Sequence, residues 1–164
     1  MADVSNIVIA AGAVFIGWKI HTNQTLLSRV MHKENEEEMQ RLARERATLD
    51  TLLHAQSDSD YADLRNNFHK LRDSETPLSE WLKDEHKLSD ELTYIRRFLN
   101  KYELVALGIN KDLLDKDLYE EWFKSSFVED WNKCRGFIND LRQKTGKETF
   151  FMQFQTLAQK WGGN

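Results

Sequence analysis

The sequence is poor in the residues that build disulfides, tight turns and metal sites. Its 164 residues include one cysteine, one proline and seven glycines. The lone cysteine, Cys134, has no partner for an internal disulfide and no CxxC pair for zinc or redox chemistry. Scarce glycine and proline favour long uninterrupted helices over a turn-rich sheet. The composition therefore predicts an all-α protein, long enough for one compact domain and an anchor.

A surplus of positive charge is also absent. The formal net charge is -4 at pH 7. A protein that binds nucleic acid ordinarily carries a basic surface that attracts phosphates. We therefore expect no nucleic-acid partner.

The sequence contains no recognisable pattern of a catalytic or metal centre. No two of its five histidines stand four residues apart, and no glycine-rich phosphate loop or GxSxG elbow occurs. Asp112, Asp115 and Asp117 lack the spacing of a calcium loop. Cys134 shares an apolar helix face with Trp131, where a thiol is normally inert. We expect no cofactor and assign no catalytic residue, so enzymatic activity stays open but unsupported.

An apolar run near the N-terminus predicts a membrane anchor over residues 1–21. Residues 4–20 contain only Ser5, Asn6 and Lys19 as strongly polar side chains, and about 17 residues is the lower limit for a spanning helix. No lysine or arginine precedes the run, which argues against a cleaved signal peptide. The alternative is a buried helix of a soluble protein, because the run is short.

The charges beside this run predict its orientation. Asp3 precedes it, whereas Lys19, Arg29 and Lys33 follow it. By the positive-inside rule, the protein would cross the inner membrane once, with its N-terminus outside and its C-terminal domain in the cytoplasm.

Residues 22–56 contain no glycine or proline and predict a stalk helix continuous with the anchor. Met39, Leu42, Leu49 and Leu53 follow heptad steps if Arg46 is counted as a core position. This stripe predicts a homo-oligomer through the stalk. The alternative is that the stripe docks on later helices of the same chain.

Residues 57–164 are expected to form a cytoplasmic helical domain. Helix starts are predicted at the cluster Ser57-Asp58-Ser59-Asp60, at Thr76-Pro77 and at Asp115, and ends at Gly108 and Gly146. A break near residues 125–126 is left open. Apolar side chains at helical spacing predict a central helix and a final aromatic helix; they are Leu88, Leu92, Ile95, Leu99, Tyr102 and Ala106, and then Phe150, Phe151, Phe154, Leu157 and Trp161.

The central helix also carries the one polar face that we single out as a candidate binding site for a partner or ligand. Its residues are Arg96, Arg97, Asn100, Lys101 and Glu103. Residues three and four apart share one side of a helix, so these side chains can act on one acidic partner. The alternative is a solvated face with an internal ion pair.

Several short motifs resemble a known family. They are residues 46–50 (RATLD), residues 96–103 (RRFLNKYE) and Gly108-Ile109, all following an N-terminal apolar span. In this order the chain resembles the bacterial and phage family called domain of unknown function DUF4760. The resemblance implies a membrane-associated helical protein and brings no established catalytic residues.

These observations favour a membrane-anchored interaction or scaffold module that binds another protein. The alternative is a small-ligand sensor or an enzyme that uses the face of residues 96–103. A deep polar pocket beside Asn100 would favour the alternative, whereas a flat or apolar face would favour the interaction module.

Overall fold

The computed structural model describes the backbone of residues 4–163 and the side chains of residue 19 and residues 21–163. In this part of the chain there are five α-helices, two short 3-10 helices and no strand, so the all-α prediction is confirmed. The chain divides into two compact units, Met1–Ala43 and Arg44–Asn164. We call them the N-terminal unit and the bundle unit and describe each by itself.

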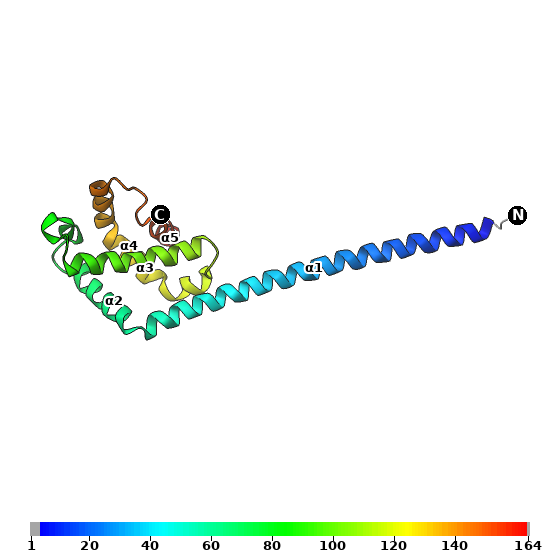
Figure 1. Ribbon diagram of the computed structural model, residues 1–164, viewed down its shortest axis with the longest axis horizontal. Coiled ribbons are helices and arrows are strands. Elements are labelled where there is room, and N and C mark those ends of the chain that lie inside the picture. The colour runs from blue at the N-terminus through cyan, green and yellow to red at the C-terminus, as the bar shows by residue number, and fades with distance from the viewer. Residues whose placement is uncertain (1–3, 164) are drawn as a thin grey trace. The chain divides into compact units, whose positions relative to one another are not determined.

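Helix α1 is a single helix from Val4 to Ser57 (Figure 1). Side chains four residues apart support it, with Lys33 Nζ 3.6 Å from Glu37 Oε1 and His32 Nε2 3.6 Å from Glu36 Oε1. The predicted anchor lies almost wholly outside the described side chains. Among the residues whose side chains are described, no helical stretch has the length and hydrophobicity needed to span a bilayer.

The apolar stripe predicted on α1 is exposed wherever it is described. In the N-terminal unit, Met39 and Leu42 are exposed, and in the bundle unit Leu49 and Leu53 are exposed. Leu49 and Leu53 therefore do not dock on the later helices of the bundle unit, as one of our alternatives required. The same turns of α1 bury a different face, that of Thr48 and Leu52.

Four further α-helices form the bundle unit, joined by two 3-10 helices. They are α2 (Ser59–Arg72), η1 (Leu78–Leu82), η2 (Asp84–His86), α3 (Asp90–Asn110), α4 (Lys116–Thr145) and α5 (Met152–Gly162). Helix α3 packs against α2 and α5, and α4 packs against α5 and η1 (Figure 1). The predicted stripe of α3 is buried from Leu92 to Ala106, which confirms α3 as the central helix.

Three of the predicted helix ends are formed by local contacts. The Asp58 carboxylate accepts hydrogen bonds from the backbone N–H groups of Asp60 and Tyr61, at 2.9 and 3.3 Å. The Asp115 carboxylate accepts one from Leu118 at 2.8 Å. Gly146 ends α4 with φ +66°, a left-handed conformation that suits glycine. Helix α4 runs without a break through residues 125–126.

Three other predictions of local structure are wrong. Thr76-Pro77 precedes only the short 3-10 helix η1, and Pro77, with an extended ψ of 140°, is its N-cap and not its first helical residue. Leu88 is 95% exposed, since Ser89 caps α3 by accepting a hydrogen bond from Leu92 N at 3.2 Å and Leu88 precedes the helix.

Gly108 lies inside α3 and does not cap its end. The chain turns later, at Asp112, which has φ +57°. A Cβ on Gly108 would lie 2.8 Å from Leu114 Cδ1, so the glycine allows the following loop to pack closely against the helix.

Candidate functional site

The structure does not bring the five residues of the predicted binding face together at one site. Arg96, Arg97, Asn100 and Lys101 are exposed, and Glu103 is half-buried. Arg96 and Asn100 line one open depression of about 300 Å³. Lys101 lines a different pocket, and Arg97 lines neither.

Glu103 is engaged inside the bundle unit. Its Oε1 accepts a hydrogen bond from Gln153 N at 3.1 Å, and its Oε2 accepts one from Phe154 N at 2.8 Å. These are backbone donors of the first turn of α5, whose N-cap residue Phe151 provides no side-chain acceptor. Glu103 therefore caps α5 from a neighbouring helix, where its negative charge also complements the helix dipole.

Polar and apolar atoms contribute about equally to the walls of the depression beside Asn100. Leu141, Phe150 and Phe151 line it together with Arg96 and Asn100. It is open to solvent and is shared by two polar side chains only. This surface suits contact with a protein better than the enclosed polar site expected of a sensor or enzyme.

A buried polar network that the sequence analysis missed joins three helices of the bundle unit. Asp130 on α4 is completely buried. It forms an ion pair with Arg72 of α2, and its Oδ2 accepts a hydrogen bond from the Tyr102 hydroxyl of α3 at 2.6 Å. Arg72 also donates two hydrogen bonds to Asp73, at 2.9 and 2.6 Å. The network satisfies a charge that would be costly to bury alone.

Two further titratable groups lie beside Asp130. His69 Nε2 is 3.9 Å from Asp130 Oδ2, and desolvation lowers the pKa of this histidine, an effect that the carboxylate partly opposes. Burial, followed by the Asp130 charge, raises the pKa of the Cys134 thiol far above its usual range. The thiol therefore stays protonated at neutral pH and is a poor nucleophile. The arrangement is best explained as a structural connection between helices.

A sequence signal for Asp130 was present. Asp130 stands three residues after Phe127 and four before Cys134, which puts a carboxylate on the apolar stripe of α4. A charge at such a position needs a buried partner. The partner, Arg72, is 58 residues away in sequence, so no local pattern identified it.

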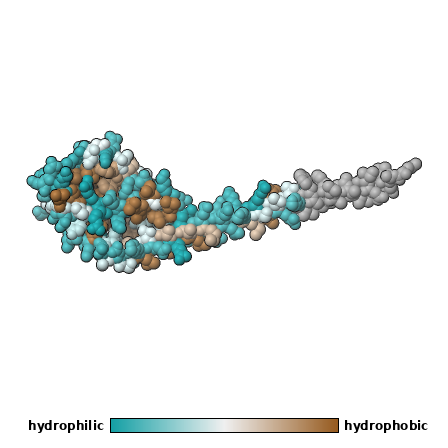
Figure 2. All heavy atoms as spheres, viewed as in Figure 1, coloured by the Kyte–Doolittle hydropathy of each residue, from teal (hydrophilic) through white to brown (hydrophobic). Residues whose placement is uncertain are grey.

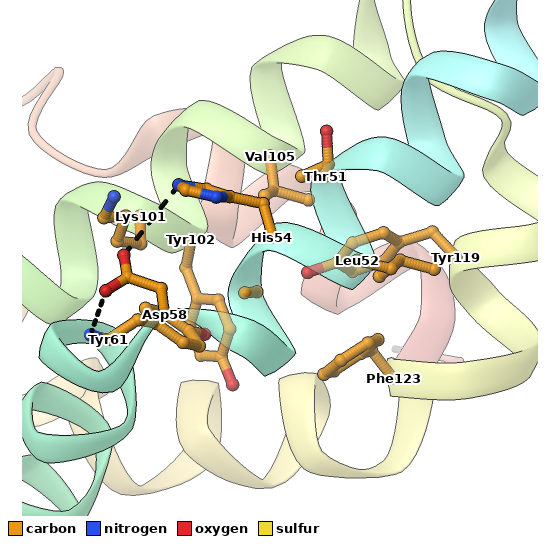
Figure 3. Close-up of a pocket in the computed structure, with 11 residues that line it drawn as sticks. Thr51, Leu52, His54, Asp58, Tyr61, Lys101, Tyr102, Val105, Tyr119 and Phe123 are labelled. Atoms are coloured by element: carbon orange, nitrogen blue, oxygen red, sulfur yellow. Dashed lines mark hydrogen bonds and ion pairs between the residues drawn. The ribbon is translucent and has the colours of Figure 1, made fainter.

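The most enclosed pocket near the predicted face lies among four helices of the bundle unit (Figure 3). It has a volume of about 90 Å³ and is lined by Thr51, Leu52, His54 and Ala55 of α1, Asp58 and Tyr61 at the start of α2, Lys101, Tyr102 and Val105 of α3, and Tyr119 and Phe123 of α4. Most of these side chains present carbon to the pocket. None of its α1, α2 or α4 residues was singled out as a site residue from the sequence, because no single helix displays the pocket.

One group of side chains in the described part of the chain could hold a metal ion, namely Glu80, Glu85 and His86. Their ligand atoms lie within 4.8 Å of one another. Glu80 already forms an ion pair with Lys83, and the His86 ring packs edge-on against Trp81. These contacts account for the cluster as part of the loop between α2 and α3.

Comparison with known proteins gives a single match. A family model described as Domain of unknown function (DUF4760) matches residues 6–161. No curated protein and no solved structure matches the chain.

Proposed function

The chain belongs to the DUF4760 family, and we propose that it is a membrane-anchored helical interaction module that positions a cytoplasmic domain at the inner membrane. The observation that carries this proposal is that one helix, α1, contains both the apolar run of residues 4–20 and the highly charged segment of residues 33–46. An apolar segment followed by charge within one helix is the pattern of an anchor and its stalk.

Exposed apolar side chains on the bundle unit support a protein partner. Leu104 on α3, Leu113 in the following loop and Trp122 on α4 are each more than 60% exposed. Figure 2 shows hydrophobic patches among hydrophilic residues on the visible face of this unit. Exposed tryptophan is enriched among the side chains that contribute most to protein interfaces.

The membrane proposal is tested by alkaline extraction. Full-length protein should stay with the membrane pellet through a carbonate wash, and deletion of residues 1–21 should release a folded soluble domain. Quantitative release of the intact chain by the wash would disprove membrane integration.

Self-association through α1 is a further part of the proposal, supported by the exposure of Leu49 and Leu53. Replacing both with Lys should lower the yield of cross-linked dimer several-fold, since like charges would then meet across the helix pair. Leu104→Lys, at a similarly exposed site on α3, is the matched control. Equal cross-linking in all three proteins would disprove pairing through this stripe.

The face of Arg96 and Asn100 is proposed as one contact for a protein partner. Arg96→Ala combined with Asn100→Ala should change the free energy of unfolding by about 0.5 kcal/mol or less, because both side chains are exposed. The double variant should localise normally and lose partners that native membranes yield with the parent protein. A variant that still captures every such partner would end the case for this contact.

The second candidate function is small-ligand sensing. The observation in its favour is the enclosed pocket that Lys101 shares with Tyr102. It places one residue of the predicted face, but not the whole face, beside a cavity.

A further inference from the structure

The size of the pocket between α1 and α4 limits what it accepts. Its volume of about 90 Å³ leaves room for a small molecule only. Leu52, Val105 and Phe123 provide apolar walls. A short aliphatic chain or one aromatic ring fits such a space, whereas a large ligand would extend into solvent.

Asp58 and Lys101 are the acidic and the basic side chain that line the pocket, and only Asp58 is engaged in contacts within the bundle unit. The Asp58 carboxylate accepts the two backbone hydrogen bonds that cap α2, and its Oδ2 lies 3.8 Å from His54 Nε2 (Figure 3). Within the described residues, the Lys101 ammonium has no ion-pair or hydrogen-bond partner. An anionic group of a ligand bound in this pocket can therefore pair with the Lys101 ammonium, while the rest of the ligand contacts the apolar lining.

Three tyrosines approach the pocket from α2, α3 and α4 (Figure 3). The Tyr102 hydroxyl donates to Asp130. The hydroxyls of Tyr61 and Tyr119 form no hydrogen bond within the part of the chain that the structure describes. Burial is the main cause that raises the pKa of both tyrosines, so both hydroxyls stay protonated at neutral pH and can donate to an oxygen atom of a ligand.

We propose that this pocket binds a short organic monocarboxylate whose aliphatic or aromatic body contacts Leu52, Val105 and Phe123 while its carboxylate pairs with Lys101. The inference rests on the second candidate function, small-ligand sensing, and names the class of ligand; it is independent of the anchoring and protein contacts proposed above. Such a ligand would touch the last turns of α1 and the helices α3 and α4 together. Its binding would therefore strengthen the packing of these turns within the bundle unit.

Binding is tested with the full-length chain, in buffer or in lipid nanodiscs, by calorimetric or ligand-observed NMR titration. The probes are benzoate and the series propionate, butyrate and pentanoate, with empty nanodiscs as the blank. Affinity should rise about fourfold for each methylene that enters the pocket and then level off when the pocket is full. Benzyl alcohol, which keeps the ring without the charge, should bind about tenfold more weakly than benzoate.

Two variants separate this site from general attraction of anions. Lys101→Gln should weaken benzoate binding about tenfold, and Arg97→Gln, which removes the same charge at another exposed position of α3, should leave it unchanged. Both side chains are exposed, so both variants should fold. Equal binding by the two variants, equal binding of benzyl alcohol and benzoate, or no binding of any acid at millimolar concentration would each overturn the proposal.

Discussion

At the scale of single residues, Asp130 shows how one carboxylate organises the bundle unit. It lies on the apolar stripe of α4 and contacts Arg72 of α2 and Tyr102 of α3. Without Asp130, Arg72 would keep only its exposed-side bonds to Asp73, and the Tyr102 hydroxyl would lose its acceptor. The network therefore stabilises the packing of three helices, provided that it stays complete.

Asp130→Ala should lower the free energy of unfolding by about 1.5–3 kcal/mol, because Arg72 keeps its bonds to Asp73 but loses its buried acceptor, and the Tyr102 hydroxyl loses its acceptor as well. Urea or thermal unfolding measures the change. Asp140→Ala, at an exposed position on the same helix, should stay within about 0.5 kcal/mol of the parent. Equal stability of the two variants would show that the buried pair contributes little.

The lowered pKa of His69 predicts that the protein loses stability in mild acid. Desolvation is the main cause that lowers its pKa below the usual 6.5, against the opposing charge of Asp130. Below pH 6.5 the unfolded chain therefore binds the proton more readily than the folded chain, so stability falls as the pH falls. Arg72 and Arg65 also disfavour the proton, and Asp73 favours it.

The melting temperature of His69→Gln should accordingly drop less than that of the parent between about pH 7.5 and about pH 5.5. His32→Gln, which changes an exposed histidine of the N-terminal unit, is the control and should behave as the parent does. An identical drop in His69→Gln and the parent would contradict this account.

At the scale of the helices, Thr48 joins α1 to the start of α4 within the bundle unit. Its side chain is buried, and its hydroxyl donates to Arg44 O at 2.8 Å while accepting from Asp115 N at 2.7 Å. An ion pair of 3.2 Å between Arg44 and Asp112 lies in the same region. The end of α1 is therefore held by polar contacts as well as by Leu52.

Thr48→Val keeps the shape of the side chain and removes the hydroxyl, so the Asp115 N–H loses its acceptor. We expect a loss of about 1–3 kcal/mol in the free energy of unfolding, with faster amide hydrogen exchange in residues 44–57. Thr51→Val is the matched control, because the Thr51 hydroxyl bonds only to the carbonyl of Ala47 in its own helix. Similar exchange in both variants would show that this contact does not hold α1.

The helices differ in how far the sequence predicts them, and the cause is the range of the contacts involved. Asp58, Asp115 and Gly146 act on residues within their own helices, so their roles follow from local patterns. Gly108 was wrongly predicted to end α3. It is a glycine because Leu114, in the loop that follows the helix, packs against it, and the local sequence does not show this contact. Pro77 was misassigned because proline at a helix start does not determine how long that helix continues.

The candidate site was predictable only in part for the same reason. The spacing of residues 96–103 places their side chains on α3, and four of the five are exposed. The sequence does not reveal that Glu103 meets backbone groups 50 and 51 residues later. The Lys101 pocket also draws its walls from three other helices, which no single helical pattern contains.

At the scale of the whole molecule, the proposed membrane anchor predicts on which side of the membrane the bundle unit lies. The positive charges of Lys19, Arg29 and Lys33 follow the apolar run, and basic flanks are retained in the cytoplasm. Cys134 is completely buried. Its failure to react with a thiol reagent would therefore say nothing about the side of the membrane on which it lies.

A new thiol at an exposed site resolves the orientation. In a Cys134→Ser background, Ser125→Cys on the exposed surface of α4 should resist a membrane-impermeant maleimide in intact cells and react after lysis. Ala2→Cys should show the opposite pattern, because the proposed topology puts the N-terminus outside. Labelling of both sites before lysis would contradict a single crossing, and a reversed pattern would place the bundle unit outside. Protection of Ser125→Cys alone is also expected of a protein confined to the cytoplasm, so the reactivity of Ala2→Cys is the result that distinguishes a membrane-spanning anchor from a soluble helix.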